Sequence, residues 1–108
     1  MNAMPSPRWS GAQTFFYPSN PDNQRLATVI QTEIRESLGN TSRIAKKADT
    51  VYLLKQLTMP TALVEVGFLS NPEEANLLAD EQYQRKVATA IYRGILRYAS
   101  GEKGEPVL

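Results

Sequence analysis

One carboxylate, Glu65, stands in the middle of an apolar and β-branched run that extends from Ala62 to Asn71. We interpret this run as a strand that is buried on both faces. An ionised carboxylate is costly to bury unless a cation or a metal lies beside it or its pKa rises. Glu65 is therefore a candidate general acid/base, because burial and nearby charge tune such a group toward neutral pH. The alternative is a structural carboxylate that pairs with an Arg or Lys inside the sheet.

The chain contains no histidine and no cysteine, which are the side chains that zinc and similar metals prefer. Together with Glu65, this absence suggests a catalytic carboxylate whose metal site lies outside this polypeptide. We therefore expect no metal-binding residues and no bound cofactor in this chain.

Several other residues permit a functional and a structural interpretation. Gly67 would let a substrate or a second backbone approach closely. Three basic residues, Arg43, Lys46 and Lys47, form either a solvated loop, which we favour, or an anion site. Trp9 could stack on a sugar or close the edge of the core.

Three segments are predicted to be strands by their β-branched and aromatic content: 11–17, 50–57 and 61–69. Residues 1–10 are expected to be irregular, and residues 40–49 to form a polar loop. Only about three strands are therefore expected in the sheet.

Three helices are also predicted. The first spans residues 21–39, because Asn20 can cap its start and Gly39 can end it. A cap at Asn71, followed by a proline and two acids, predicts a short helix over 72–79. An apolar stripe at helical spacing predicts a last helix from about residue 80 to 101. This order of elements suits an α/β layer fold.

Composition excludes several classes of function. The net charge of +1 gives no reason to expect nucleic acid or an anionic membrane as a partner. No run of apolar residues is long enough to span a membrane. The first residues lack the basic and apolar regions of a signal peptide. With 108 residues, the chain is at most one domain.

Two segments resemble a known family. Residues 60–72, Pro-Thr-Ala-Leu-Val-Glu-Val-Gly-Phe-Leu-Ser-Asn-Pro, and residues 11–17, Gly-Ala-Gln-Thr-Phe-Phe-Tyr, resemble the zinc-dependent N-acetylmuramoyl-L-alanine amidases of the type-3 family. The resemblance extends over residues 1–99. Residues 52–55 and 92–98 look most like the sporulation branch, which acts on spore-cortex peptidoglycan.

The resemblance implies roles for individual residues. In this family two His and one Glu hold zinc, and a second Glu works with the metal-bound water. Glu65 matches that second Glu, whereas the three metal ligands have no match in this chain. Residues 1–3, Met-Asn-Ala, look like the residues that follow the second ligand His. We therefore expect the C-terminal half of an amidase, produced by an internal start, a frameshifted gene or expression of a fragment.

The resemblance also implies the architecture. Residues 1–100 are expected to be the C-terminal portion of an amidase catalytic domain, with a mixed or parallel sheet flanked by helices. Residues 101–108 are expected to form a flexible tail. A long apolar sheet edge would be exposed without the first strands, so we also consider self-association through that edge.

The implied activity is peptidoglycan hydrolysis. The parent enzyme would cleave the amide between N-acetylmuramic acid and L-alanine with zinc as cofactor, outside the cytoplasm at the cell wall or spore cortex, in sporulation and germination. A proton shuttle alone supplies about 10²–10⁴-fold acceleration, whereas enzymes accelerate reactions by about 10⁶-fold or more. We therefore expect this chain alone to be inactive. The alternatives are an inert, metal-free remnant and a module that binds cell-wall glycopeptide.

Overall fold

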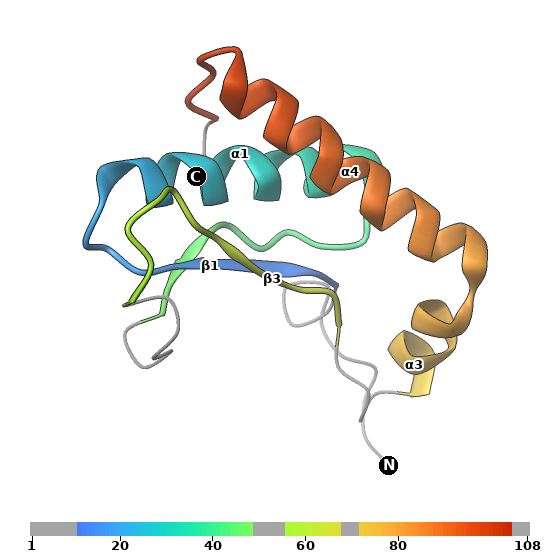
Figure 1. Ribbon diagram of the computed structural model, residues 1–108. Helices are drawn as coiled ribbons and strands as arrows, with labels where there is room; N and C mark the ends of the chain where they lie inside the picture. The colour runs from blue at the N-terminus through green and yellow to red at the C-terminus, as the bar shows by residue number, and fades with distance from the viewer. Residues whose placement is uncertain (1–10, 49–55, 68–71, 105–108) are drawn as a thin grey trace.

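The computed structural model describes residues 11–48, 56–67 and 72–104. Two long helices lie together on one side of a three-stranded sheet (Figure 1). The strands are β1 (Gln13–Phe16), β2 (Lys46–Lys47) and β3 (Leu63–Glu65), in the spatial order β2-β1-β3. β1 pairs in parallel with β2 and antiparallel with β3. The described residues therefore form the mixed α/β arrangement that the sequence predicts.

Helix α1 (Pro21–Leu38) begins and ends where its capping residues predict. The side chain of Asn20 accepts a hydrogen bond of 2.9 Å from the backbone N–H of Asp22. Gly39 has φ of 69°, a left-handed conformation that favours glycine. Its N–H donates to the carbonyl of Arg35 at 3.1 Å, which satisfies a carbonyl of the last turn.

The two C-terminal helices are also confirmed. They are α3 (Pro72–Ala79) and α4 (Glu81–Ala99). The carboxylate of Asp80 caps α4 by accepting hydrogen bonds from the backbone N–H groups of Gln82 and Tyr83. Gly101 ends α4 as predicted: it follows the cap Ser100 with a φ of 95°, and its N–H donates to the carbonyl of Tyr98 at 3.0 Å.

The strands differ from prediction more than the helices do. β2 lies inside the segment expected to be a polar loop, where a backbone hydrogen bond of 2.8 Å from Ala48 to Phe16 continues the pairing with β1. β3 occupies three residues of the predicted 61–69 segment. Most of the strand predicted over 50–57 lies outside the described residues, and Gln56 is helical. Residues 1–10 lie outside the described part as well.

The core lies between α1, α4 and one face of the sheet. Its buried centre consists of Ala12, Ile30, Ile34 and Ala90, and Val64 of β3 packs against it. Since side chains alternate along a strand, Leu63 and Glu65 point to the opposite face. We call the face with Leu63 and Glu65 the far face.

A side-chain amide completes the edge of β1 where β2 does not reach. Gln31 of α1, which is fully buried, accepts a hydrogen bond of 2.8 Å from the backbone N–H of Thr14. Its Nε2 donates to the carbonyl of Ala12 at 3.0 Å. Gln31 thereby supplies the donor and the acceptor that a neighbouring strand would have supplied.

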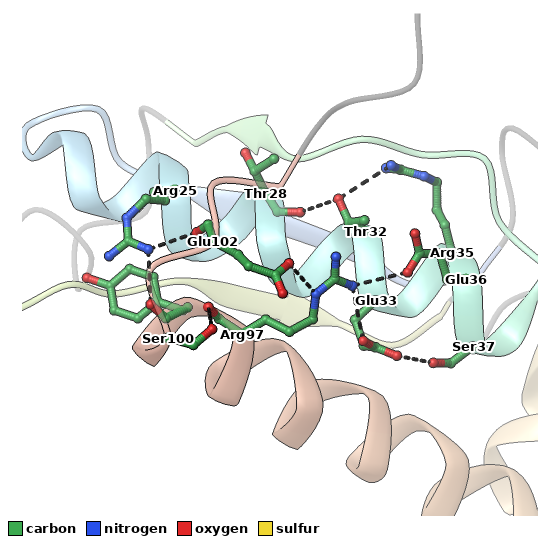
Figure 2. A network of polar contacts seen from close by, with 11 residues as sticks. Arg25, Thr28, Thr32, Glu33, Arg35, Glu36, Ser37, Arg97, Ser100 and Glu102 are labelled. Carbon is green, nitrogen blue, oxygen red and sulfur yellow. Dashed lines mark hydrogen bonds and ion pairs between the residues drawn. The ribbon is translucent and has the colours of Figure 1, made fainter.

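Close packing and an ionic network join α1 to α4. A Cβ added to Gly94 would lie 2.8 Å from the Cα of Ile30, so the two helix backbones touch at this position. Nearby, the guanidinium of Arg97 contacts the carboxylates of Glu33 and Glu36 at 3.1 Å each, and that of Glu102 at 2.7 Å (Figure 2).

The chain beyond α4 turns back onto α1. Arg25 donates hydrogen bonds to the carbonyls of Tyr98 and Glu102 at 3.0 and 2.9 Å, and its guanidinium lies 3.8 Å from the centre of the Tyr98 ring. Residues 101–104, the described part of the expected tail, therefore lie against α1. A domain boundary at residue 100 remains a prediction.

Candidate acid/base site

Glu65 is the last residue of β3, and it is exposed on the far face. The expectation that it lies in a strand buried on both faces is wrong for the described structure. β3 is the edge strand of the sheet, and the two long helices cover the other face. The ion pairs formed by the described residues do not include Glu65, so the structural pairing considered as an alternative has no support there.

Gln13 is the residue that the sheet places directly beside Glu65. The two residues are register partners in the antiparallel pair of β1 and β3. Gln13 is 6% exposed, and its Oε1 accepts a hydrogen bond of 3.4 Å from Nη1 of Arg43. Sequence reasoning missed Gln13, although a polar residue inside a strand with aromatic neighbours is a signal of an internal hydrogen bond.

The basic residues of the predicted loop have separate environments. Arg43 is half-buried and points its guanidinium inward to Gln13, which departs from the solvated loop that we favoured. Lys46 and Lys47 form β2 and are exposed. Arg35 of α1 donates to the carbonyl of Arg43 at 3.0 Å. Burial lowers the pKa of the Arg35 guanidinium, and the charge of Glu36 offsets part of this effect.

An apolar cavity lies next to the site rather than at it. Its volume is about 490 Å³, and apolar side chains of α3, of α4 and of the chain just after β3 dominate its lining. The lining includes Val66, Leu78, Val87 and Ile91, together with Gly67, but does not include Glu65. Trp9 and Asn71 lie outside the described residues.

A metal site is not formed by the residues that the structure describes. They contain no group of three or more carboxylates, histidines or cysteines that could hold an ion. The whole sequence has neither histidine nor cysteine. The residues present therefore do not fit zinc.

Neither long helix is a candidate for crossing a membrane. Across the described ranges, no helix combines the length and the apolar character that a span requires.

Comparison with known families gives a match over most of the chain. The family model described as N-acetylmuramoyl-L-alanine amidase matches residues 1–97. The germination-specific N-acetylmuramoyl-L-alanine amidase of Bacillus subtilis is 54% identical over 106 residues, which are 98% of this chain and 44% of that protein. The chain thus spans less than half the length of this relative.

Solved structures agree with the sequence match. The CwlD amidase from Clostridioides difficile, in complex with the GerS lipoprotein, is 42% identical with a TM-score of 0.82 over 94% of this chain and 52% of that chain. The catalytic domain of the amidase CwlV from Bacillus (Paenibacillus) polymyxa is 27% identical with a TM-score of 0.74, over 94% of this chain and 55% of that one.

Proposed function

Because this chain belongs to the N-acetylmuramoyl-L-alanine amidase family, we propose that it carries the general acid/base of a peptidoglycan hydrolase. The bond cleaved is the amide between N-acetylmuramic acid and L-alanine. The observation that supports this proposal is the family match over residues 1–97. Among the strands that the structure describes in this range, β3 is the one that ends in an exposed carboxylate. That carboxylate is Glu65.

The chemistry requires a group that can move a proton. Hydrolysis of an amide takes a proton from the attacking water and delivers one to the departing amine, and a positioned carboxylate can perform both transfers. Glu65 is exposed, so water and a substrate can reach its oxygens without a rearrangement of the sheet. Since the described residues do not fit zinc, we propose that a zinc ion used by the parent enzyme is held by residues outside this chain.

The names of the relatives support a location and a partner class. Two further relatives are named cell wall amidases, one from Bacillus anthracis and one from Staphylococcus aureus. With the germination-specific relative, they favour action outside the cytoplasm, at the cell wall or spore cortex. The C. difficile relative was solved with a lipoprotein, and we propose a lipoprotein as a candidate partner here.

The experiment that tests the proposal is a chimera. Residues 1–108 of this chain replace the matching stretch of the B. subtilis germination-specific amidase, and release of stem peptide from purified peptidoglycan is measured. In this chimera we predict that Glu65→Gln lowers activity by at least about 10²-fold while zinc content stays unchanged, because the substitution removes a proton carrier and no ligand.

The matched control is Glu81→Gln, which makes the same chemical change at an exposed surface pair on α4. Its activity should equal that of the unsubstituted chimera. An inactive unsubstituted chimera would favour the inert remnant or the glycopeptide-binding module. Loss of zinc in Glu65→Gln would instead make Glu65 a ligand and contradict the assigned role.

A further inference from the structure

A groove between α1 and α4 is lined mostly by cationic and hydroxyl side chains. Its volume is about 250 Å³, and its lining consists of Ser37 of α1 and of Arg85, Lys86, Thr89, Ala90 and Arg93 of α4. Three of these residues are cations and none is an acid. All of them except Ala90 are exposed, so a ligand can reach them from solvent.

The neighbouring acids are directed away from this groove. Beyond its first residue, Glu81, α4 contains four cations and no acid. The two acids of α1 that lie within about one turn of Ser37 are Glu33 and Glu36, and both contact Arg97. The positive charge of the groove is therefore not neutralised from α1.

Two cations of the groove have no carboxylate partner. None of the ion pairs within the described ranges includes Lys86 or Arg93. Arg85, by contrast, contacts the carboxylate of Glu81 at 2.7 Å. The cations available to an anionic ligand are therefore Lys86 and Arg93.

The spacing of these two cations suits a ligand with more than one acid. Seven residues make about two turns of a helix, so Lys86 and Arg93 lie on the same side of α4, about 10 Å apart along its axis. Thr89 lies between them and can donate a hydrogen bond to an anion. A guanidinium binds a carboxylate through two parallel N–H groups. This row of donors fits a chain-like ligand that carries several carboxylates.

The other side of α4 borders the apolar cavity beside the acid/base site. Ala88 lines that cavity together with Val66 and Gly67, which directly follow Glu65 in the chain. Ala88 is two residues beyond Lys86, and such positions point to nearly opposite sides of a helix. A polymer that crosses α4 can therefore reach both the groove and the end of β3.

We propose that this groove binds the carboxylates of peptidoglycan stem peptides other than the one being cut, and so holds the wall polymer beside Glu65. The choice of polymer rests on the proposed function. Peptidoglycan suits the groove because it presents many stem peptides on one polymer, and the uncut ones carry free carboxylates. The groove takes no part in the chemical step.

Co-sedimentation of the 108-residue chain with insoluble peptidoglycan, purified free of phosphate-containing polymers, tests the proposal. We predict that the double variant Lys86→Gln/Arg93→Gln binds about tenfold more weakly than the unsubstituted chain, because it loses two ion pairs of modest strength. Added salt should weaken binding of the unsubstituted chain and reduce the difference between the two proteins.

The matched control is Lys46→Gln/Lys47→Gln, which removes the same charge from the exposed strand β2. It should bind peptidoglycan as the unsubstituted chain does. Conversion of the carboxylates of peptidoglycan to amides should weaken binding of the unsubstituted chain to the level of the groove variant.

Three results would overturn the inference: full binding by the groove variant, an equal loss in the control, or full binding to amidated peptidoglycan. Binding that depends on the groove but requires a phosphodiester polymer would also overturn it, because the ligand would then be a phosphate. The amidated polymer keeps the test decisive even if the groove variant does not fold.

The chimera separates this inference from the proposed function. There the groove variant should raise the apparent KM for peptidoglycan about tenfold and leave kcat unchanged, since it removes binding that is equal in the ground and transition states. Glu65→Gln should bind peptidoglycan fully although it is inactive. Unchanged binding and KM in the groove variant would overturn only the groove, whereas a fully active Glu65→Gln chimera would overturn the proposed function.

Discussion

At the scale of single residues, Arg97 makes the largest number of ionic contacts described in this chain. One guanidinium contacts three carboxylates, those of Glu33 and Glu36 on α1 and that of Glu102 beyond α4 (Figure 2). The Arg97 side chain is 26% exposed and that of Glu33 is 11% exposed, so solvent screens this pair less than a surface pair. The hydrogen bond to Glu102 raises the pKa of Arg97, burial opposes it, and Glu33 and Glu36 add to the rise.

We predict that Arg97→Met lowers the free energy of unfolding by about 1–2 kcal/mol, because it leaves the buried Glu33 without its cation. The raised pKa means that the stability from Arg97 is fully present below the pKa of the unfolded chain and is lost only as pH rises through the pKa of the folded chain. The loss caused by the substitution should therefore be constant from about pH 6 to pH 10. Urea unfolding at several pH values measures it.

Arg85→Met is the matched control for this prediction. Arg85 and Glu81 are 77% and 75% exposed, and a pair of this kind contributes less than about 1 kcal/mol. If the two variants lose the same free energy of unfolding, the network around Arg97 contributes no more to stability than an exposed ion pair.

The sequence predicts which residue carries the candidate acid/base group, but it does not predict which residues surround that group. Glu65 is conspicuous because it is the one charge within an apolar run. The same run suggests burial on both faces, yet the structure exposes Glu65, because apolar content does not reveal which strand lies at an edge. The pairing of Gln13 with Glu65 and the contact of Arg43 with Gln13 could not be inferred from sequence, since strand register and a contact across 30 residues of chain depend on the fold.

At the scale of elements, the packing of α1 on α4 depends on the absence of a side chain at Gly94. The added Cβ would meet the Cα of Ile30 at 2.8 Å and its Cγ1 at 3.0 Å. Backbone atoms cannot move aside as a flexible side chain can. The close approach therefore requires glycine at this position.

We predict that Gly94→Ala destabilises the chain by about 1–3 kcal/mol through overpacking. This loss exceeds the gain of about 1 kcal/mol that alanine offers over glycine in a helix. The midpoint of urea unfolding measures it. Thr89→Ala, on an exposed position of the same helix, should change stability by less than about 0.5 kcal/mol. A more stable Gly94→Ala variant would mean that the helices separate without cost.

Helices were predicted well and strands less well, for physical reasons. The helix signals are local, since Asn20, Gly39 and Asp80 act on backbone groups within a few residues. Strand pairing is not local. Lys46 and Lys47 have little intrinsic preference for strands and pair only because β1 lies alongside them.

At the scale of the whole molecule, large apolar side chains remain exposed just after β3 and on α3 and α4. Val66, Leu77, Tyr92, Ile95 and Leu96 are between 36% and 61% exposed. The outer edge of β3 has no neighbouring strand among the described residues. An unpaired edge of this kind is a template for pairing with another chain.

We therefore predict that the isolated chain sediments as a species heavier than the monomer at micromolar concentration. Leu63→Lys, which places a charge on β3 beside the free edge, should shift it toward the monomer. Gln24→Lys, on an exposed position of α1, adds the same charge and should have no effect. A monomeric chain with cooperative unfolding would contradict this prediction and show a self-sufficient domain.

The two sides of the sheet differ in whether they can accept a new strand. On the β2 side, Gln31 occupies the edge of β1 at Thr14 and Ala12, and the two residues of β2 are exposed lysines, a short and charged edge that resists pairing. Among the strands that the structure describes, a further strand can therefore be added only beside β3. If two copies paired through this edge, each would satisfy the unpaired backbone groups of the other. No third copy could then add to the sheet. Such an assembly has a two-fold axis and is a closed pair, whereas a sheet open at both sides could extend into a filament.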